Sequence, residues 1–447
     1  MGFIPHTAAD RQAMLDKIGV ERIEDLFHDI PADKRYVAFD LPEPLSEMEA
    51  GWELGALSKA NIGANDCACF LGAGAYNHYA PSVVDYVLQR GEFYTAYTPY
   101  QPEISQGTLQ AIFEYQSMVC ALTGMEAANA SHYDGATSLA EAVIMAVNVH
   151  RGKRDKVILS PAVHPEYRQV VRTYTQGMGL TITGDEDLTA DLAALQALVD
   201  DDTAMLAVQS PNFFGQVQDL SSLAEACHAH KALLVVVADP ISLGMFRSPG
   251  SVGADIVVGE GQSLGGGLNF GGPYLGFFAV RKKHVRRMAG RLVGETTDAD
   301  GQRGYVLTLA TREQHIRRER ATSNICTNEG LLALAAAVYM AALGRCGLPK
   351  VASLCYHKAH YAAAQIDALE GYEVGKDKPF FKEFVVKCPH PVAEINQHLL
   401  DEWDIIGGYD VGRDYPHLAD HMLIAVTEVN TREEIDDLVA ALEGMAT

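Results

Sequence analysis

The sequence predicts an α/β protein whose large domain carries a mostly parallel β-sheet. Between residues 66 and 330, short apolar runs alternate with amphipathic helical spans, a pattern typical of βαβ units. From residue 331 to 447, one long apolar helix is followed by fewer strands and helices, which predicts a linker helix and a small C-terminal α+β domain. Residues 1–65 contain too little apolar sequence for a core of their own, which predicts an N-terminal helical arm.

The arm is expected to consist of short helices. Thr7 is a suitable N-cap for a first helix, which should stop at Ile18-Gly19. Leu45–Lys59 is a second helix candidate. Because the arm lacks a core, we expect it to pack on a neighbouring chain.

The large domain should contain six strands and at least five helices. The strands are expected at Lys156–Leu159, Leu180–Thr183, Ala204–Gln209, Leu233–Val237, Ile256–Val258 and Leu275–Val280. The helices are expected at Ser105–Thr123, Ser138–Val149, Pro165–Gln176, Leu192–Leu198 and Ser221–His230. The linker helix and the small-domain elements are expected at Leu331–Arg345, Phe384–Lys387, Pro391–Glu402, His421–Val426 and Thr431–Met445.

Composition excludes several functional classes. A formal net charge of −23 over 447 residues argues against nucleic acid, whose phosphates require a basic surface. We find no apolar run of about 18 residues and no signal-peptide core, so we expect a cytoplasmic protein without a membrane span. Of eight cysteines only Cys67 and Cys69 are close, and their one-residue spacing is not that of a zinc or redox motif, so we expect reduced thiols and no metal site.

The segment Leu233–Val280 carries the most informative pattern in the chain. An apolar run ends in Asp239, and a second strand and a glycine-rich stretch, Gly261–Gly272, follow. In open α/β sheets, ligands bind at the carboxyl ends of the strands. This order resembles the aspartate-aminotransferase-like family of pyridoxal-phosphate (PLP) enzymes, in which such an aspartate pairs with the pyridinium nitrogen and a lysine further on forms the Schiff base.

The Schiff-base lysine of that family is missing from this chain. Gln262 occupies the aligned position, 23 residues after Asp239, and no lysine occurs between Lys231 and Lys282. A glutamine amide is not an amine nucleophile. The chain therefore carries a relic of a PLP site, and we expect no catalytic residue in this chain alone.

Three further sites follow strands in the order that the resemblance implies. Gly135, Ala136 and Thr137 precede a helix whose N-terminus is suited to a phosphate, or they form a plain N-cap with Thr137 or Ser138 as the capping residue. His164 stands where the resembling enzymes stack an aromatic ring on the cofactor, or it is an ordinary loop residue. Asn212 is placed to contact a ring substituent or only to hold its turn, and Asp239 itself is alternatively a capping or salt-bridging carboxylate.

A tyrosine-rich stretch is the most specific motif. It includes Tyr94, Tyr97, Tyr100, Glu103 and Gln106. So many aromatic side chains with so few charges indicate an interface or a ligand contact more than a plain surface loop. Glu103 either orients a ligand or places its charge near a helix N-terminus.

This stretch, YTAYTPYQPEISQG, closely resembles the signature of the glycine cleavage system P-protein (glycine decarboxylase) family. The same holds for LGAGAYNHYAP at Leu71–Pro81, SHYDGATSLAEA at Ser131–Ala142 and ATSNICTNE at Ala321–Glu329. Members exist as one long chain or as two subunits. The length of the chain and Gln262 make it similar to the N-terminal-half, or alpha, subunit.

The resemblance implies a function shared between two chains. The beta subunit would carry the lysine and PLP, and no cofactor would be covalently bound to this chain. The whole enzyme would bind glycine through PLP, release CO2 and pass the aminomethyl group to the lipoamide of H-protein. Two alternatives stay open: a non-catalytic scaffold with a relic pocket, or a stand-alone PLP-dependent lyase that uses a lysine elsewhere.

Overall fold

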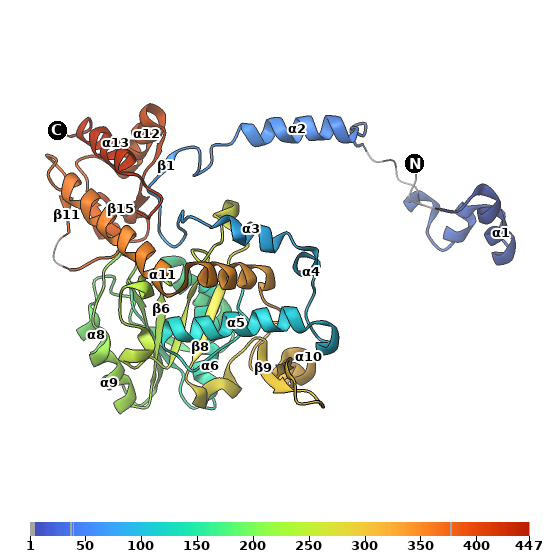
Figure 1. Ribbon diagram of the computed structural model, residues 1–447, viewed down its shortest axis with the longest axis horizontal. Helices are drawn as coiled ribbons and strands as arrows, with labels where there is room; N and C mark the ends of the chain where they lie inside the picture. The colour runs from blue at the N-terminus through green and yellow to red at the C-terminus, as the bar shows by residue number, and fades with distance from the viewer. Residues whose placement is uncertain (1–4, 36–37, 39, 376–377, 447) are drawn as a thin grey trace. The chain divides into compact units, whose positions relative to one another are not determined.

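The computed structural model describes residues 5–35, 38, 40–375 and 378–446. The contacts within the chain separate residues 1–62 from residues 63–447. The larger unit is an α/β domain that carries a small α+β domain at its C-terminal end (Figure 1).

The central sheet of the large domain has seven strands. Their order is β2 (Ala127–Ala128), β8 (Gly276–Val280), β7 (Ile256–Glu260), β6 (Leu233–Ala238), β5 (Thr203–Ser210), β3 (Lys156–Leu159) and β4 (Thr181–Thr183). The strands from β7 to β4 are parallel, whereas β8 runs antiparallel to both of its neighbours. The six predicted strands of this domain are confirmed within two residues at each end. Five of them are local apolar runs that are largely buried on both faces, whereas the edge strand β4 is half-buried or exposed.

Alternate side chains of the strands pack against helices on opposite faces of the sheet. In β6, Leu233, Val235 and Val237 pack with α6 (Gly135–Val149) and α7 (Pro165–Thr175). Leu234, Val236 and Ala238 pack in the core that includes α5 (Gln106–Thr123), α9 (Ser221–Ala229) and the first part of α11 (Gly330–Ile366). Helices α5 and α11 lie side by side in this layer (Figure 1).

Helix α11 differs from its prediction. The expected end at Arg345 is wrong, because the helix resumes after a break at Gly344, where φ is 59°, and runs to Ile366. Ala352, Cys355 and Ala359 are buried in the second part, so packing overrides the local stop signals, which include Pro349. By length and composition alone, α11 is long and apolar enough to cross a membrane, which was not expected from the sequence. Its broken, core-packed course instead makes it a structural helix of this domain.

A hairpin was also not predicted. Strands β9 (Leu292–Thr297) and β10 (Arg303–Thr308) pair antiparallel and contact α5. Most of their residues are half-buried or exposed, so they lack the continuous apolar run that revealed the sheet strands.

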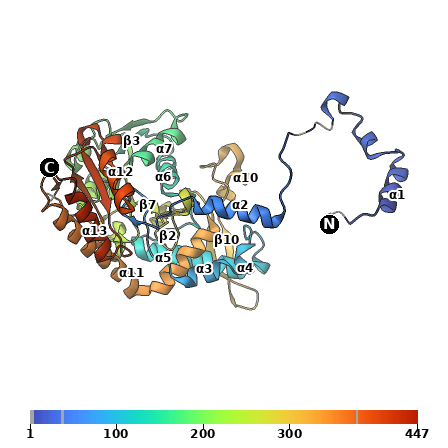
Figure 2. The ribbon, with the colours of Figure 1, turned by 90° about the horizontal axis from the view of Figure 1, so that it is seen from above.

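The small domain is a four-stranded antiparallel sheet covered by two helices. Its strand order is β11 (Glu373–Val374), β12 (Glu383–Lys387), β15 (His421–Ala425) and β14 (Tyr409–Asp410). Helices α12 (Val392–Trp403) and α13 (Arg432–Glu443) pack against each other (Figure 2). Near the start of the larger unit, β1 (Ala68–Cys69) pairs with β13 (Ile405–Ile406).

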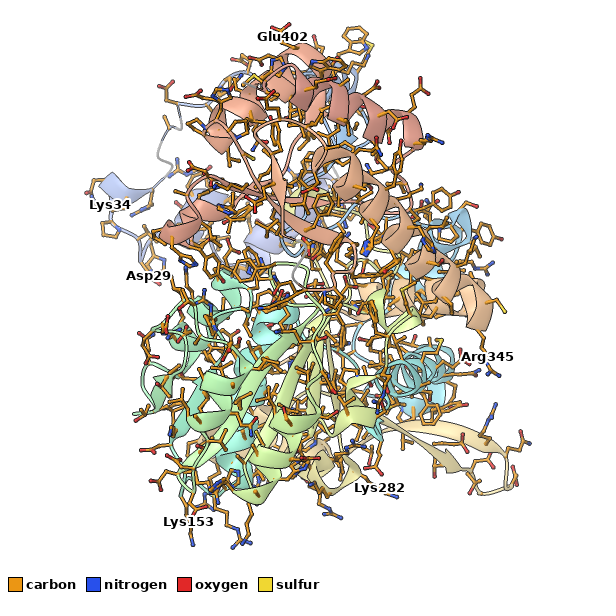
Figure 3. The ribbon with its side chains drawn as sticks, turned by 90° about the vertical axis from the view of Figure 1, so that its left-hand side faces the viewer. Asp29, Lys34, Lys153, Lys282, Arg345 and Glu402 are labelled. Atoms are coloured by element: carbon orange, nitrogen blue, oxygen red, sulfur yellow. The ribbon has the colours of Figure 1, made fainter. Side chains whose placement is uncertain are left out.

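The small domain lies at the carboxyl end of the parallel strands. Lys153 just precedes β3, and Lys282 just follows the antiparallel β8, so both lie at the amino ends of the parallel strands. Glu402 in α12 lies at the opposite end of the view (Figure 3). Side chains that follow β5, β6 and β7 are therefore directed toward the interface between the two domains.

The described residues of the smaller unit form short helices, as predicted for the arm of residues 1–65. Helix α1 (Ala8–Ile18) is capped by Thr7, whose hydroxyl accepts a hydrogen bond from the Asp10 amide, and it ends at Gly19 with φ of 87°. Helix α2 is shorter than expected at its start and spans Glu47–Lys59. Among the described residues of this unit only Leu15 is buried. The unit therefore has almost no core of its own.

Candidate active site

One small pocket lies at the carboxyl ends of β5, β6 and β7. It brings together three residues singled out in the sequence, His164, Asp239 and Gln262. It also contains residues that the sequence analysis did not select, namely Gly74, Tyr76, Tyr167, Gln209, Glu260 and Ser263. The cavity that remains between them is about 40 Å³. Since one water needs about 10–15 Å³ on this measure, the pocket has room for a few water molecules.

Asp239 directly follows β6 and makes two kinds of contact. Its Oδ1 accepts hydrogen bonds from the amides of Ile241 and Ser242, at 2.8 and 3.3 Å, and so caps the turn that follows. Its Oδ2 lies 2.6 Å from Lys382 Nζ, in a pair whose side chains are 13% and 2% exposed. The alternative of a capping and salt-bridging carboxylate thus describes the contacts of Asp239 in this chain.

Lys382 is held on three sides. Besides Asp239, its ammonium lies 3.1 Å from His78 Nε2 and 3.5 Å from the centre of the Tyr76 ring. Burial, followed by the charge of Lys382, lowers the pKa of His78. A neutral His78 ring accepts from Lys382 at Nε2 and donates from Nδ1 to Glu428 Oε2 at 2.6 Å. These contacts join the small domain, through Lys382 and Glu428, to the end of β6.

The same network contains three neighbouring side chains of types that bind metal ions. His78, Cys355 and Glu428 place their ligand atoms within 4.8 Å of one another. However, both ring nitrogens of His78 already have hydrogen-bond partners, and the Cys355 thiol donates to Glu428. A protonated lysine beside the imidazole also opposes a cation there. We therefore interpret the cluster as a hydrogen-bond network.

Gln262, at the position of the missing lysine, is buried and fully hydrogen-bonded. Its Nε2 donates to the carbonyl oxygens of Tyr76 and Gly266 at 2.9 and 3.0 Å. Its Oε1 accepts from the Tyr76 amide at 3.0 Å. The Tyr76 hydroxyl in turn donates to Glu383 Oε2 at 2.8 Å. The side chain of Gln262 therefore pins the segment around Tyr76 across the pocket.

The N-terminus of α6 is occupied by carboxyl groups. The helix begins at Gly135, three residues earlier than predicted, and its N-cap is Asp134, so the expected cap at Thr137 or Ser138 is wrong. Glu260 Oε2 accepts from the Gly135 amide at 3.0 Å, and Oε1 accepts from the amides of Gln262 and Leu275. Ala136 and Thr137 follow within the first turn.

At the α6 end of the pocket, close packing requires glycine at position 135, and burial raises the pKa of Glu260. A Cβ atom on Gly135 would lie 2.3 Å from the Tyr167 hydroxyl and 2.8 Å from the Glu260 amide, so only glycine fits there. Burial raises the pKa of Glu260 to about 7, although its three backbone donors favour the ionised carboxylate.

His164 caps α7 and lies against other rings. Its Nδ1 accepts from the Glu166 amide, its Nε2 donates to the Ala73 carbonyl oxygen at 2.8 Å, and burial lowers its pKa. Its ring centre is 5.0 Å from that of Tyr167. The amide of His164 donates to Gln209 Oε1. The ring is thus fixed by partners within the chain.

Asn212 lies apart from this pocket and lines a different cavity. Its Oδ1 accepts from the amides of Phe214 and Gln216 at 3.0 and 2.9 Å, a turn-holding role that the sequence analysis had considered.

The tyrosine-rich segment lines a third cavity, of about 240 Å³, beside the start of α11. Tyr94 and Tyr97 line it and are 70% and 86% exposed. The hydroxyl of Tyr100 accepts from Arg291 at 3.1 Å. Gln106 is tied to β10 through the amide and carbonyl groups of Tyr305. Glu103 is exposed in the turn before α5.

These residues do not fit PLP. The position of the Schiff-base lysine is glutamine, the carboxylate of Asp239 is paired with Lys382, and the Gly135 amide is paired with Glu260. Sites for small molecules and cofactors usually enclose about 300 Å³ or more, well above the 40 Å³ found here. Tyr76 and His78 belong to the LGAGAYNHYAP motif, which carried the family resemblance but did not mark them as site residues, and nothing local in the sequence singles out Lys382 or Glu260.

Comparisons with known proteins agree with the resemblance of the motifs. The model of the glycine cleavage system P-protein family matches residues 1–442. The probable glycine dehydrogenase (decarboxylating) subunit 1 of Thermomicrobium roseum is 55% identical, over 99% of each chain. A crystal structure of glycine decarboxylase (P-protein) in inhibitor-bound form superposes with a TM-score of 0.91 and 44% identity, over 99% of this chain and 100% of that one.

The fold extends to more distant enzymes. Mouse CSAD, at 15% identity, has a TM-score of 0.68 over 96% of this chain and 92% of its own, which supports the fold alone. Together these neighbours show that the large domain has the fold of PLP-dependent enzymes of fold type I. The chain belongs to the glycine cleavage system P-protein family, within which it corresponds to the alpha subunit of a two-subunit glycine decarboxylase.

Proposed function

We propose that this chain acts in glycine decarboxylation as the subunit without cofactor, and that its beta partner carries both the reactive lysine and PLP. The observation that carries the proposal is the internal pairing of Asp239, Gln262 and the Gly135 amide, the three groups of this pocket that stand where the resembling enzymes bind the cofactor. On this proposal the assembled enzyme works in the cytoplasm, takes glycine as substrate, releases CO2 and transfers the aminomethyl group to lipoylated H-protein. PLP would supply the electron sink on the partner chain.

The competing hypothesis of a stand-alone PLP lyase has one structural candidate, Lys382, the lysine that contacts Asp239. Its position opposes that role. In PLP the ring nitrogen and the aldehyde-bearing carbon stand on opposite sides of the ring. A lysine that contacts the carboxylate facing the nitrogen is therefore on the wrong side to form the Schiff base.

Borohydride reduction tests the assignment. The assembled enzyme is reduced in the presence of PLP, digested and analysed by mass spectrometry. We expect a stoichiometric pyridoxyl-lysine on the partner chain and no stoichiometric adduct at Lys382, because Lys382 is paired with Asp239; residues 239–281 contain no lysine and should carry no adduct. A stoichiometric adduct at Lys382 would support the stand-alone lyase, and full activity of the beta chain alone would support a mere scaffold.

We further propose that the tyrosine-rich segment, residues 94–106, completes the active site of the partner. Tyr94 and Tyr97 are large, mostly exposed aromatic side chains beside an apolar cavity, and such surfaces are costly to leave in water. A phenol also donates hydrogen bonds to a carboxylate or phosphate while its ring excludes water. On this proposal Glu103, which is exposed close by, orients a ligand amine, and Gln106, which is hydrogen-bonded to β10, braces the segment.

Single substitutions Tyr97→Phe and Tyr100→Phe are expected to lower glycine–bicarbonate exchange by the assembled enzyme about tenfold or more. The reason is the loss of a hydrogen bond made mainly in the transition state, worth about 1.4 kcal/mol. Tyr79→Phe is the matched control, since Tyr79 is also exposed but lies outside the segment. Normal exchange rates in both variants, with assembly and PLP content unchanged, would show that the segment only packs at the subunit interface.

A further inference from the structure

Side chains of this chain contact the groups in the pocket that would bind the ring nitrogen and the phosphate of a pyridine phosphate. An ammonium faces Asp239, the aspartate at the end of β6. A carboxyl group faces the amide at the N-terminus of α6. A neutral amide occupies the position of the Schiff-base lysine. The three replacements come from β7, from the loop after it and from the small domain.

We propose that Lys382 and Glu260 are built-in replacements for the pyridinium and phosphate groups of PLP, and that they close this pocket to pyridine phosphates permanently. The proposal rests on the assignment of the cofactor to the partner chain and extends it. The pocket of the alpha subunit becomes a structural junction between the two domains, which holds its shape without cofactor. The assembled enzyme should then bind one PLP for each alpha–beta pair.

Lys382 has the surroundings of an enclosed cation. It immediately precedes β12, its side chain is 2% exposed, and it contacts a carboxylate, an imidazole nitrogen and the face of an aromatic ring. A buried ammonium without such partners would be strongly destabilising. Asp239 likewise has its second oxygen committed to the backbone. A pyridinium could reach Asp239 only by displacing Lys382 into a buried, unpaired state.

Glu260 closes the opposite end. Its two oxygens accept three backbone amides, including that of Gly135 at the start of α6, where anions are favoured. The contact of Gly135 with Glu260 and Tyr167 leaves no room for a phosphate between them. Glu260 ends β7, so its position is set by the sheet and not by a mobile loop.

The segment around Tyr76 seals the pocket between these two groups. Gln262 holds both backbone polar groups of Tyr76, and Glu383 holds its hydroxyl. His78 and the Tyr79 amide bind the two oxygens of Glu428. Because these partners come from both domains, opening the pocket would break the domain junction as well.

Two measurements on the full-length chain test this inference. Pyridoxine 5′-phosphate, which has the ring and phosphate of PLP but no aldehyde to react with surface lysines, is titrated into the wild-type chain by calorimetry. We expect no saturable binding at millimolar concentration. Saturable binding would overturn the inference while leaving the partner's borohydride result, and hence the subunit assignment, intact.

The second measurement is a double-mutant cycle with Lys382→Met and Asp239→Asn. Each single variant is expected to lower the Tm by about 5 °C or more, because the remaining member of the pair is left buried without its partner. The double variant should lose clearly less than the sum of the two, and Lys387→Met, at an exposed lysine that ends the adjacent strand β12, should change little. Additive losses, or a Lys382→Met variant as stable as wild type, would contradict the proposed pair. If Lys382→Met fails to fold while the double variant folds, the coupling is demonstrated directly; if both fail, the calorimetric titration of the wild type decides.

Discussion

Asp185→Ala is expected to lower the free energy of unfolding by about 3–5 kcal/mol, the usual effect of removing one member of a buried charge cluster. Asp185 lies just beyond β4, and its side chain is 2% exposed. Its oxygens bind Arg168 Nη1 at 3.1 Å and Arg172 Nη2 at 2.6 Å. Without Asp185, two guanidinium groups remain close together, one of them largely buried.

The cluster also connects the two domains. Arg168 Nη2 donates to the hydroxyl of Tyr415 in the small domain, and that hydroxyl donates to the carbonyl oxygen of Pro161. The effect of Asp185→Ala should therefore appear in unfolding of both domains. Urea unfolding followed by circular dichroism measures it, with Asp202→Ala, at an exposed aspartate of the same domain, as control. Loss of less than about 1 kcal/mol would contradict the burial of this cluster.

The same residue predicts a dependence on pH. Burial raises the pKa of Asp185, but the hydrogen bonds and charges of Arg172 and Arg168 outweigh it, so the net pKa is lowered. A carboxyl whose folded pKa is lowered contributes stability above its unfolded pKa and loses it as the pH falls through the folded pKa. The wild type should thus lose stability in acid more steeply than Asp185→Ala.

Deleting residues 1–40 is expected to weaken association with the beta subunit about 100-fold or more. The described residues of this part include exposed apolar side chains, among them Met14, Ile18, Ile23, Leu26 and Ile30. Obligate subunit interfaces commonly bury more than about 2,000 Å², and a few central apolar residues contribute most of the affinity, about 2 kcal/mol or more each. Size-exclusion chromatography and titration with the beta chain measure the loss.

A substitution variant distinguishes the loss of apolar contacts from the loss of chain length. Ile18→Ser combined with Leu26→Ser and Ile30→Ser removes exposed apolar surface and keeps the arm. The matched control is Asp16→Ser, at an exposed polar position of α1. Because residues 1–62 form a separate unit, the Tm of residues 63–447 should remain unchanged in all of these variants. Unchanged co-elution of the deletion variant would show that the arm does not carry the interface.

The sequence alone determined six of the seven described strands of the central sheet and the absence of the reactive lysine, but it did not reveal the two-residue β2. Strands buried on both faces are local apolar runs, so their positions can be read within a short window. Asp239, His164 and Gln262 follow strands of one parallel sheet, which is why they were expected together and why the structure brings them into one pocket. Asn212 also follows a strand, but its side chain turns back on its own loop.

Only the tertiary structure decided what fills that pocket. Lys382 lies 143 residues after Asp239, in a different domain, and nothing in the neighbouring sequence distinguishes it from an exposed lysine. The continuation of α11 beyond Gly344 depends in the same way on packing with residues distant in sequence. The cap of α6 at Asp134 and the β9–β10 hairpin are local contacts, which the apolar pattern alone did not reveal. Burial and charge pairing between domains are long-range properties. The segment after Asp239 contains no lysine, yet in the folded chain Lys382 of the small domain lies against Asp239.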